Sequence, residues 1–344
     1  MKTRFFLLLP LSILALSSCE KLKEKVSPIG LLVAGTAVED RVEMSYEYFQ
    51  NHKYDFEMVD NTHSTDGSYT FLVGADSHLT DDASRMVEML QIGLDSDDLL
   101  YTHLGDIADT KADYYIRLDS LIQEAKAKWV KKNYTVVNDK YGIYTRNLDI
   151  GDPYAEEEQY DKIRYPFYPV VGNHDITHNG WALWSNIFHS SFYQVFVIGI
   201  DPSDGEIYFD RFIFLDSASG TLGKKQIELI KEGTFDSDGE KFFRYTFVFS
   251  HTNIFRPQFF EFASTFTREE TFFLLDQFEK WNVNCVFCGH VHTWDERDYN
   301  GVHYLTLDTM CEKNNPDPGD YLVRLNVGCN EITWEPVHMN SKQK

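Results

Sequence analysis

Gly172-Asn173-His174-Asp175 follows the apolar run 167–171, and the other polar motifs of the chain stand in the same relation to apolar runs. A strand that ends in Gly and then presents Asn, His and Asp predicts a loop that aims polar side chains into a site. Other polar clusters also follow apolar runs: Asp76-Ser77-His78, Gly105-Asp106-Ile107-Ala108-Asp109, His251, and Gly289-His290-Val291-His292. Because each cluster sits at a strand end, we expect a folded sheet to gather all five at one edge.

The composition is that of a folded and strongly acidic protein. The chain has 344 residues, of which 43% are hydrophobic, and this is ample for a core. Its formal charge of -22 argues against nucleic-acid binding, which depends on phosphate neutralisation by Lys and Arg. A small phosphorylated substrate is still compatible with this charge, because two bound divalent cations would reverse the local field.

Strand and helix signals alternate along the chain. Apolar runs at 69–75 and 99–104 predict strands, and the apolar periodicity of 113–132 predicts an amphipathic helix. A polar turn separates the apolar segments 192–200 and 207–215, which predicts an antiparallel pair. Thr267 and Glu270 have capping-box spacing at the start of another helix. The alternation indicates an α/β fold.

One main domain is expected over residues 67–344, because no composition shift marks a second one. Residues 19–66 are interpreted as a tether and an N-terminal extension that packs on this domain. A polar, Tyr-rich insertion at about 133–165 is long enough to be functional, and we interpret it as a roof over the site.

The N-terminus has the features of an export signal. Lys2 and Arg4 precede the apolar run 5–16, which is too short to cross ~30 Å of hydrocarbon. Leu16-Ser17-Ser18-Cys19 follows and resembles a bacterial lipobox. The resemblance implies removal of residues 1–18 and a lipid on Cys19, so we expect an exported protein anchored to the bacterial cell envelope. An ordinary signal peptide with an incidental Cys is the alternative.

The residue types in the five clusters suit a two-metal hydrolytic centre. Such a centre needs a ligand shared by two cations, and a carboxylate can bridge them, which makes Asp106 the natural bridge. Mixed oxygen and nitrogen ligands would come from Asp76, His78, Asn173, His251, His290 and His292. Two divalent cations would carry about +4 against two carboxylates, which leaves a positive site for phosphate. A metal-bound hydroxide would then attack the ester, because the metals bring the pKa of bound water near 7.

The order Asp-x-His, Gly-Asp-x-x-Asp, Gly-Asn-His-Asp, His, Gly-His-x-His resembles the calcineurin-like metallophosphoesterase superfamily over residues 70–310. The resemblance implies a sandwich of two mixed β-sheets flanked by helices. It assigns one metal to Asp76, His78, Asp106 and His292. It assigns the other metal to Asp106, Asn173, His251 and His290.

The resemblance also implies that His174 is not a ligand but protonates the leaving oxygen, kept cationic by Asp109, while Asp175 holds the loop. Thr110 stands where the protein serine/threonine phosphatases of the superfamily have Arg, and Asp109 stands where purple acid phosphatases have Tyr. Neither of those subfamilies is therefore expected. The two metals are expected to be manganese, iron or zinc.

The expected function is hydrolysis of a small phosphate monoester or diester. The alternative is a lipid-anchored binding scaffold with the phosphoesterase fold and an inactive site. The oligomeric state is not predicted. His103, Trp181 and Trp184 are interpreted as structural, and we do not expect His178 or His189 to contact the substrate.

Overall fold

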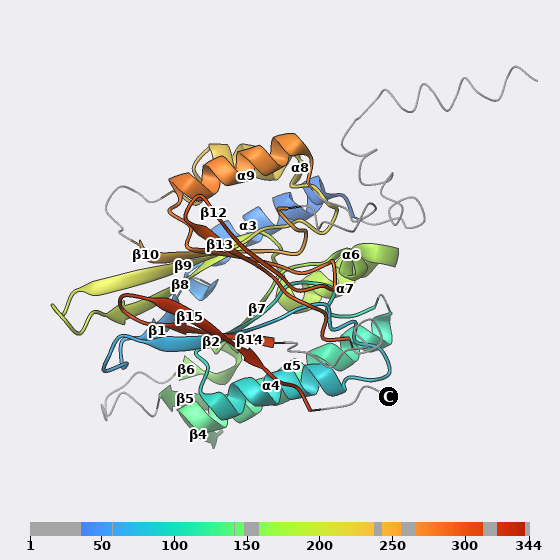
Figure 1. Cartoon of the computed structure of the whole chain (residues 1–344). Coiled ribbons are helices and arrows are strands. Elements are labelled where there is room, and N and C mark those ends of the chain that lie inside the picture. Colours follow the sequence, from blue (N-terminus) through green and yellow to red (C-terminus); the bar gives the residue numbers. More distant parts are fainter. Residues whose placement is uncertain are drawn as a thin grey trace, which may run out of the picture.

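The computed structural model describes residues 36–56, 58–109, 111–140, 142–147, 158–236, 243–255, 266–311 and 322–340. The expected signal segment and Cys19 lie outside these residues. No helix in the described ranges combines the length and apolar character that a membrane crossing requires. Two large β-sheets pack face to face with helices on their outer faces (Figure 1), which confirms the predicted α/β sandwich.

The smaller of these two sheets has five strands in the order β15-β14-β2-β3-β7. Their bounds are Ile332–Val337, Leu322–Val327, Tyr69–Gly74, Leu100–His103 and Phe167–Pro169. β2, β3 and β7 are parallel neighbours, whereas β14 is antiparallel to both β2 and β15. Helices α4 (Ser84–Ser96) and α5 (Ala112–Asn133) cover the outer face of this sheet (Figure 1).

The larger sheet has seven strands in the order β1-β8-β9-β10-β11-β13-β12. Their bounds are Met58–Asn61, Tyr193–Ile200, Ile207–Phe214, Phe243–Ser250, Cys285–Cys288, Val302–Thr306 and Asp295–Tyr299. β8 and β9 form the predicted antiparallel pair. Helices α3 (Val38–Phe56), α8 (Gly223–Lys231) and α9 (Arg268–Lys280) cover the outer face (Figure 1).

Central strands of both sheets are apolar on both faces, because each face meets another layer. In β9, Phe212 and Phe214 point between the sheets and pack near Phe71 of β2. Ile213 points the other way, into the cluster under α3, α8 and α9. A strand covered on both faces gives a continuous apolar run instead of an alternating one.

Helix α9 begins where its capping box predicts. The Thr267 hydroxyl accepts the N–H of Glu270 at 3.3 Å, and Glu270 accepts the N–H of Thr267 at 3.1 Å. Two backbone donors that the helix leaves unpaired at its first turn are therefore satisfied.

The insertion contains a separate small sheet. Its strands are β4 (Tyr134–Asp139), β5 (Gly142–Asn147) and β6 (Glu158–Gln159). α5 has 22 residues, and at 1.5 Å per residue it spans about 33 Å between the loop after β3 and β4. The small sheet therefore lies beyond the far end of α5, whereas residues 160–165 run back beside this helix. The expectation that the insertion roofs the site is wrong for the small sheet.

The N-terminal extension contributes to the main domain. α3 packs on α8 and β8, and β1 pairs in parallel with β8 at the edge of the larger sheet. β1 therefore extends a sheet that the later part of the chain forms, and α3 packs against that sheet. The expected lipid tether before them is outside the described residues.

Candidate metal centre

Five loops carry the predicted site residues, and each follows the carboxyl end of a strand. The strands are β2, β3 and β7 in one sheet and β10 and β11 in the other. Side chains from the two sets of loops meet: His78 lies 3.2 Å from His292, and Asn173 lies 2.9 Å from His251. The five clusters thus meet at one edge of the sandwich, although they come from two sheets and not from one. We call seven of these side chains the His/Asp cluster: Asp76, His78, Asp106, Asn173, His251, His290 and His292.

Much of the His/Asp cluster has left-handed backbone geometry. φ lies between 42° and 73° at Asp76, His78, Asp106, His290 and His292. This conformation costs a non-glycine residue roughly 1–2 kcal/mol, so neighbouring groups must hold it. Asp76 N–H donates to Gly105 O at 3.1 Å, and His78 N–H donates to Asp106 O at 3.0 Å. The two loops after β2 and β3 therefore stabilise each other.

Gly172 allows the loop after β7 to approach the loop after β3 closely. A Cβ at this position would lie 2.1 Å from the backbone nitrogen of Asp106 and 2.2 Å from its Oδ1. Only a residue without a side chain fits there. The contact also brings His174 N–H within 2.7 Å of Asp106 Oδ1, to which it donates.

One half of the His/Asp cluster leaves a carboxylate oxygen unpaired. Asp76 Oδ2 accepts the N–H of His290 at 2.9 Å. Asp76 Oδ1 is buried without a hydrogen-bond partner, 3.4 Å from His292 Nε2. His292 Nε2 in turn lies 3.2 Å from His78 Nε2. A buried carboxylate oxygen and two ring nitrogens converging on one point match the first coordination sphere of a cation.

The other half joins two imidazoles and an amide. His251 Nδ1 donates to Leu104 O at 2.7 Å, which leaves Nε2 to face the cluster. Asn173 Oδ1 and His290 Nδ1 lie 2.9 and 3.1 Å from this Nε2. One proton can satisfy one of these pairs, whereas a cation can accept lone pairs from all three. Burial, followed by the neighbouring His251, lowers the pKa of His290 to about 4, so its ring is neutral and can ligate a metal.

Asp106 lies between the two halves. Its Oδ1 accepts the N–H of His174, so Oδ2 is the free oxygen. Asp106 Oδ2 lies 3.9 Å from His78 Nε2 and 3.5 Å from His251 Nε2. An oxygen between two sets of donor atoms could be shared if each set held a cation.

The donor set fits divalent transition metals. Three overlapping triplets bring their ligand atoms within 4.8 Å of one another: Asp76 with His78 and His292, His78 with Asp106 and His174, and Asp106 with His251 and His290. Mixed carboxylate, amide and imidazole donors suit manganese, iron and zinc. Proximity alone does not separate His174 from the other histidines.

Asp109 contacts two histidines. Its Oδ1 lies 3.3 Å from His174 Nδ1 and 3.4 Å from His78 Nδ1. The hydrogen bond to Asp109 raises the pKa of His174 to about 9, and the same bond holds the pKa of Asp109 below its usual range. The predicted Asp109–His174 pair is therefore present. The contact with His78 was not predicted. It holds Nδ1 of this ring, while Nε2 faces the other candidate ligands.

Asp175 holds the loops together, as the resemblance implies. It is fully buried; Oδ2 accepts the N–H of Gly172 at 2.8 Å, and Oδ1 accepts the N–H of Ile107 at 3.1 Å. The Tyr115 hydroxyl also donates to Oδ1 at 3.0 Å. Sequence reasoning missed Tyr115, because it lies on α5 with no spacing that ties it to Asp175.

His103, Trp181 and Trp184, which were interpreted as structural, are buried, and none of them belongs to the His/Asp cluster. His103 is fully buried, and burial lowers its pKa to about 3, so it is neutral. Trp181 and Trp184 belong to α7 (Gly180–Phe188) and stack on each other in the core. His189 stacks on Tyr48 at the far end of α7 from the motif.

Comparison with known proteins finds similar solved structures but no match by sequence. No protein-family model and no curated protein matches the chain. Among solved structures, GAP50, the anchor in the inner membrane complex of Plasmodium, is 13% identical, with 79% of this chain and 84% of that chain covered and a TM-score of 0.51. A dimetal phosphatase from Danio rerio is 12% identical over 78% of this chain and 98% of that chain, with a TM-score of 0.45. The phosphopantetheinyl hydrolase PptH from Mycobacterium tuberculosis is 12% identical over 75% of this chain and 95% of that chain, with a TM-score of 0.41.

The sandwich of two mixed sheets, with five ordered motif loops meeting at one edge, is the arrangement that the sequence resemblance implies. This chain shares its fold with the GAP50 structure, and the motif loops at the edge of that fold are those that carry the resemblance to the calcineurin-like metallophosphoesterase superfamily.

Proposed function

We propose that this protein is a binuclear metal-dependent phosphoesterase that hydrolyses a small phosphate monoester or diester. The observation that carries the proposal is the position of Asp106 Oδ2 between two sets of converging donor atoms. In this proposal Asp76, His78, Asp106 and His292 hold one cation. Asp106, Asn173, His251 and His290 hold the other.

When bound, the two cations would activate water for attack on phosphorus and neutralise charge on the phosphoryl oxygens. The remaining steps belong to the chain's own residues. Asp76 and Asp106 supply two buried negative charges, and imidazole ligands, which bind a metal in their neutral form, would add no further charge. The site then keeps a net positive charge that favours a phosphate group.

His174 is proposed to protonate the leaving oxygen. Its Nδ1 is held by Asp109, so Nε2 is the nitrogen that can deliver a proton. The raised pKa keeps the ring cationic near neutral pH, which is the form that a general acid needs. The ring is also 44% exposed, so a substrate can reach it.

We also propose that the protein is exported and anchored to the bacterial cell envelope through a lipid on Cys19. The support is the order of basic residues, apolar run and Leu16-Ser17-Ser18-Cys19 in the sequence. A charged segment, residues 20–25, would then serve as a solvated tether. Mass spectrometry of the envelope fraction tests this, with an acylated Cys19 as the expected N-terminus and an unmodified Cys19 as the contrary result.

The central test combines metal analysis of the purified full chain with a panel of phosphate monoesters, diesters and nucleotides. We expect two metals per chain and turnover of at least one compound. Asp106→Asn should reduce turnover by about 10³-fold, because it weakens a ligand to both cations, worth several kcal/mol. Asp95→Asn is the matched control, since Asp95 is exposed on α4 and its contact with Gln91 needs only an acceptor oxygen.

Full activity of Asp106→Asn after chelation would refute the proposal. The alternative, a lipid-anchored scaffold with an inactive site, predicts no turnover of any compound by the metal-loaded chain. Complete convergence of all seven side chains favours the enzyme.

A further inference from the structure

A cavity of about 510 Å³ lies along β7, the edge strand of the five-stranded sheet. We call it the edge cavity. It is lined by residues of α5, of the segment 162–165, of β7, of the end of α7 with His189, and by Tyr193 at the start of β8. No member of the His/Asp cluster lines it, and neither does His174 or Asp109. The edge cavity is therefore separate from the candidate metal centre.

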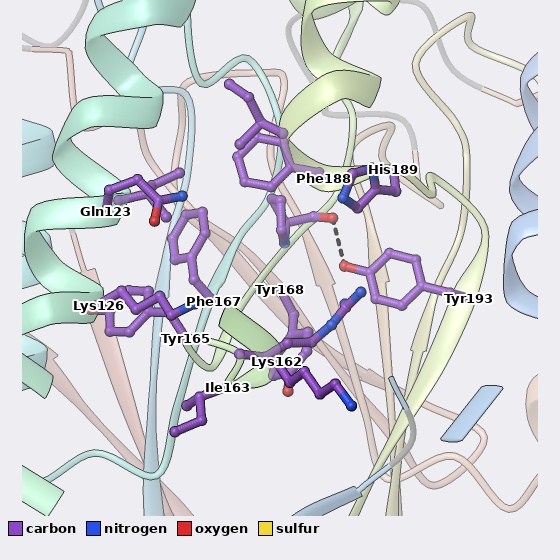
Figure 2. Close-up of a pocket in the computed structure, with 14 residues that line it drawn as sticks. Gln123, Lys126, Lys162, Ile163, Tyr165, Phe167, Tyr168, Phe188, His189 and Tyr193 are labelled. Atoms are coloured by element: carbon purple, nitrogen blue, oxygen red, sulfur yellow. Dashed lines mark hydrogen bonds between the residues drawn. The ribbon is translucent and has the colours of Figure 1, made fainter. Parts of the chain in front are cut away.

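Figure 2 shows how the walls are arranged. Gln123 and Lys126 of α5 lie on one side of the cavity, and His189 and Tyr193 lie on the other. The cavity forms here because β7 has no further strand beside it among the described residues, so the sandwich is open between α5 and β8. The Tyr193 hydroxyl donates to Pro169 O at 2.8 Å and so satisfies a carbonyl of this free strand edge.

The deep walls of the edge cavity are aromatic and apolar. Phe167, Tyr168 and Tyr193 are buried, with Ile122 and Ile163 beside them. Most of the described lining residues are apolar or aromatic, but polar atoms contribute the larger share of the exposed wall. A volume of this size is typical of small-molecule sites. The walls suit a flat ring or another apolar body.

The charged groups of the edge cavity are all positive. Lys126, Lys162 and Arg164 line it, and none of its described lining residues is Asp or Glu. In the chain as a whole, 54 acidic residues outnumber 32 basic ones. The charged side chains in the described part of the wall are thus opposite in sign to the protein's net charge, and a cavity of one sign attracts ions of the other.

Two of the polar lining residues are positioned from behind by α3. Arg164 Nη2 donates to the Tyr48 hydroxyl at 3.2 Å. The Tyr48 ring stacks on His189 with a centroid distance of 4.8 Å. A guanidinium held in place loses less conformational freedom when it meets a ligand.

We propose that the edge cavity is a second ligand site, which binds a small organic anion with an aromatic or other flat apolar body. Lys126, Lys162 and Arg164 contact its acidic group, and the walls around Phe167 and Tyr193 contact its body. Two residues, Val170 and Val171, separate the cavity-lining Pro169 from the motif glycine Gly172. The site is thus adjacent to the metal loop but does not share its residues, and the proposal does not depend on the proposed hydrolysis.

The test uses 8-anilinonaphthalene-1-sulfonate, an aromatic anion that a phosphoesterase cannot hydrolyse. Fluorescence titration of the full chain should give one site. The double variant Lys126→Gln/Lys162→Gln should weaken binding by about tenfold, the effect of two partly exposed charge pairs. Lys128→Gln/Lys131→Gln removes the same charge from exposed positions of the same helix and should leave the Kd unchanged.

Two further titrations distinguish anion binding in the edge cavity from general apolar binding and from binding at the metal centre. N-phenyl-1-naphthylamine has the same rings without the sulfonate and should bind at least tenfold more weakly. Asp106→Asn should bind the sulfonate as wild type does, because the probe does not sit on the metal centre. An unchanged Kd in the Lys126/Lys162 variant with an unaltered melting temperature would overturn the proposal. Equal binding of the neutral probe, or loss of binding in Asp106→Asn, would also overturn it.

Discussion

The His/Asp cluster and the edge cavity share two elements but have opposite chemistry. β7 lines the cavity with residues 167–169 and leads into the motif at Gly172, while α7 begins near the motif and reaches the cavity at Phe188. The cluster contains the buried carboxylates Asp76 and Asp106, whereas the charged groups among the described lining residues of the cavity are all cations. Buried carboxylates with unpaired oxygens need cations beside them. Partly exposed lysines are solvated and do not need a counter-charge in the same way.

The two regions also differ in how their geometry is fixed. In the cluster the backbone itself is forced into left-handed conformations by loop-to-loop hydrogen bonds. In the cavity ordinary strand and helix backbones leave a space at a free sheet edge, and side chains supply the chemistry. We therefore expect changes in the cluster to alter metal binding or turnover without altering anion binding in the cavity.

His174→Ala is expected to give the largest loss of turnover that leaves anion binding in the edge cavity unchanged. Removing a general acid reduces turnover by about 10²- to 10⁴-fold. Both metals should remain, since His174 is proposed to act on the substrate and not as a ligand. Sulfonate binding in the edge cavity should be unchanged. The measurements are kcat, metal content and the fluorescence titration, with exposed His63→Ala as the control.

Loss of both metals from His174→Ala would make His174 a ligand and would contradict its proposed role. The result matters because His174 lies in the same triplet as His78 and Asp106.

A smaller effect is expected for Gly172→Ala. The added methyl would overlap the backbone nitrogen of Asp106 and its Oδ1, so the loop after β3 must move. A displacement of about 1 Å at a catalytic group can reduce the rate about 10²-fold. Metal content should also fall, because Asp106 Oδ2 moves with the loop. Activity and metal content after loading at several metal concentrations measure both effects.

Gly328→Ala is the matched control, because its Cβ would meet the nearest atom at an ordinary 3.4 Å. Unchanged activity in Gly172→Ala would show that the close approach to Asp106 is not needed for the site. Weaker sulfonate binding in this variant would show that β7 couples the two regions.

The contrast between the regions also explains what the sequence could predict. Each cluster residue lies in a short motif at a strand end, so order and spacing predict that they converge. The cavity residues have no common spacing: Lys126 is on a helix face, Arg164 is in a loop and Tyr193 begins a strand in the other sheet. They come together only through the way in which the helices and strands pack in the fold.

The same reasoning applies to the fold. Long periodic segments such as 113–132 and 192–200 were predicted correctly, because their apolar spacing records the layer that they face. β12 was not predicted, because Asp295–Tyr299 is charged and lies at a sheet edge, where few apolar contacts are needed. The path of the insertion was also mispredicted, because it depends on the length of α5 more than on local composition.

The smallest loss of activity is expected for Asp109→Asn, and this variant tests the proposed mechanism most directly. Asp109 touches His174 and His78, so this variant tests two roles. Loss of the hydrogen-bonded carboxylate removes the main cause that raises the pKa of His174, which then falls from about 9 towards its ordinary value of 6.5. A general acid must be protonated, so activity is lost as pH rises through its pKa. The basic limb of the kcat profile should therefore lie at lower pH in Asp109→Asn than in wild type.

The contact with His78 predicts a second effect, a 10- to 100-fold loss of metal affinity, which is typical when the outer partner of a ligating histidine is removed. Excess metal should restore occupancy, but it should not restore the basic limb, because the carboxylate beside His174 is still missing. A kcat profile measured at saturating metal thus isolates the effect on His174. If that profile coincides with wild type while metal affinity is reduced, Asp109 acts through His78 alone, and the cationic form of His174 depends on other groups.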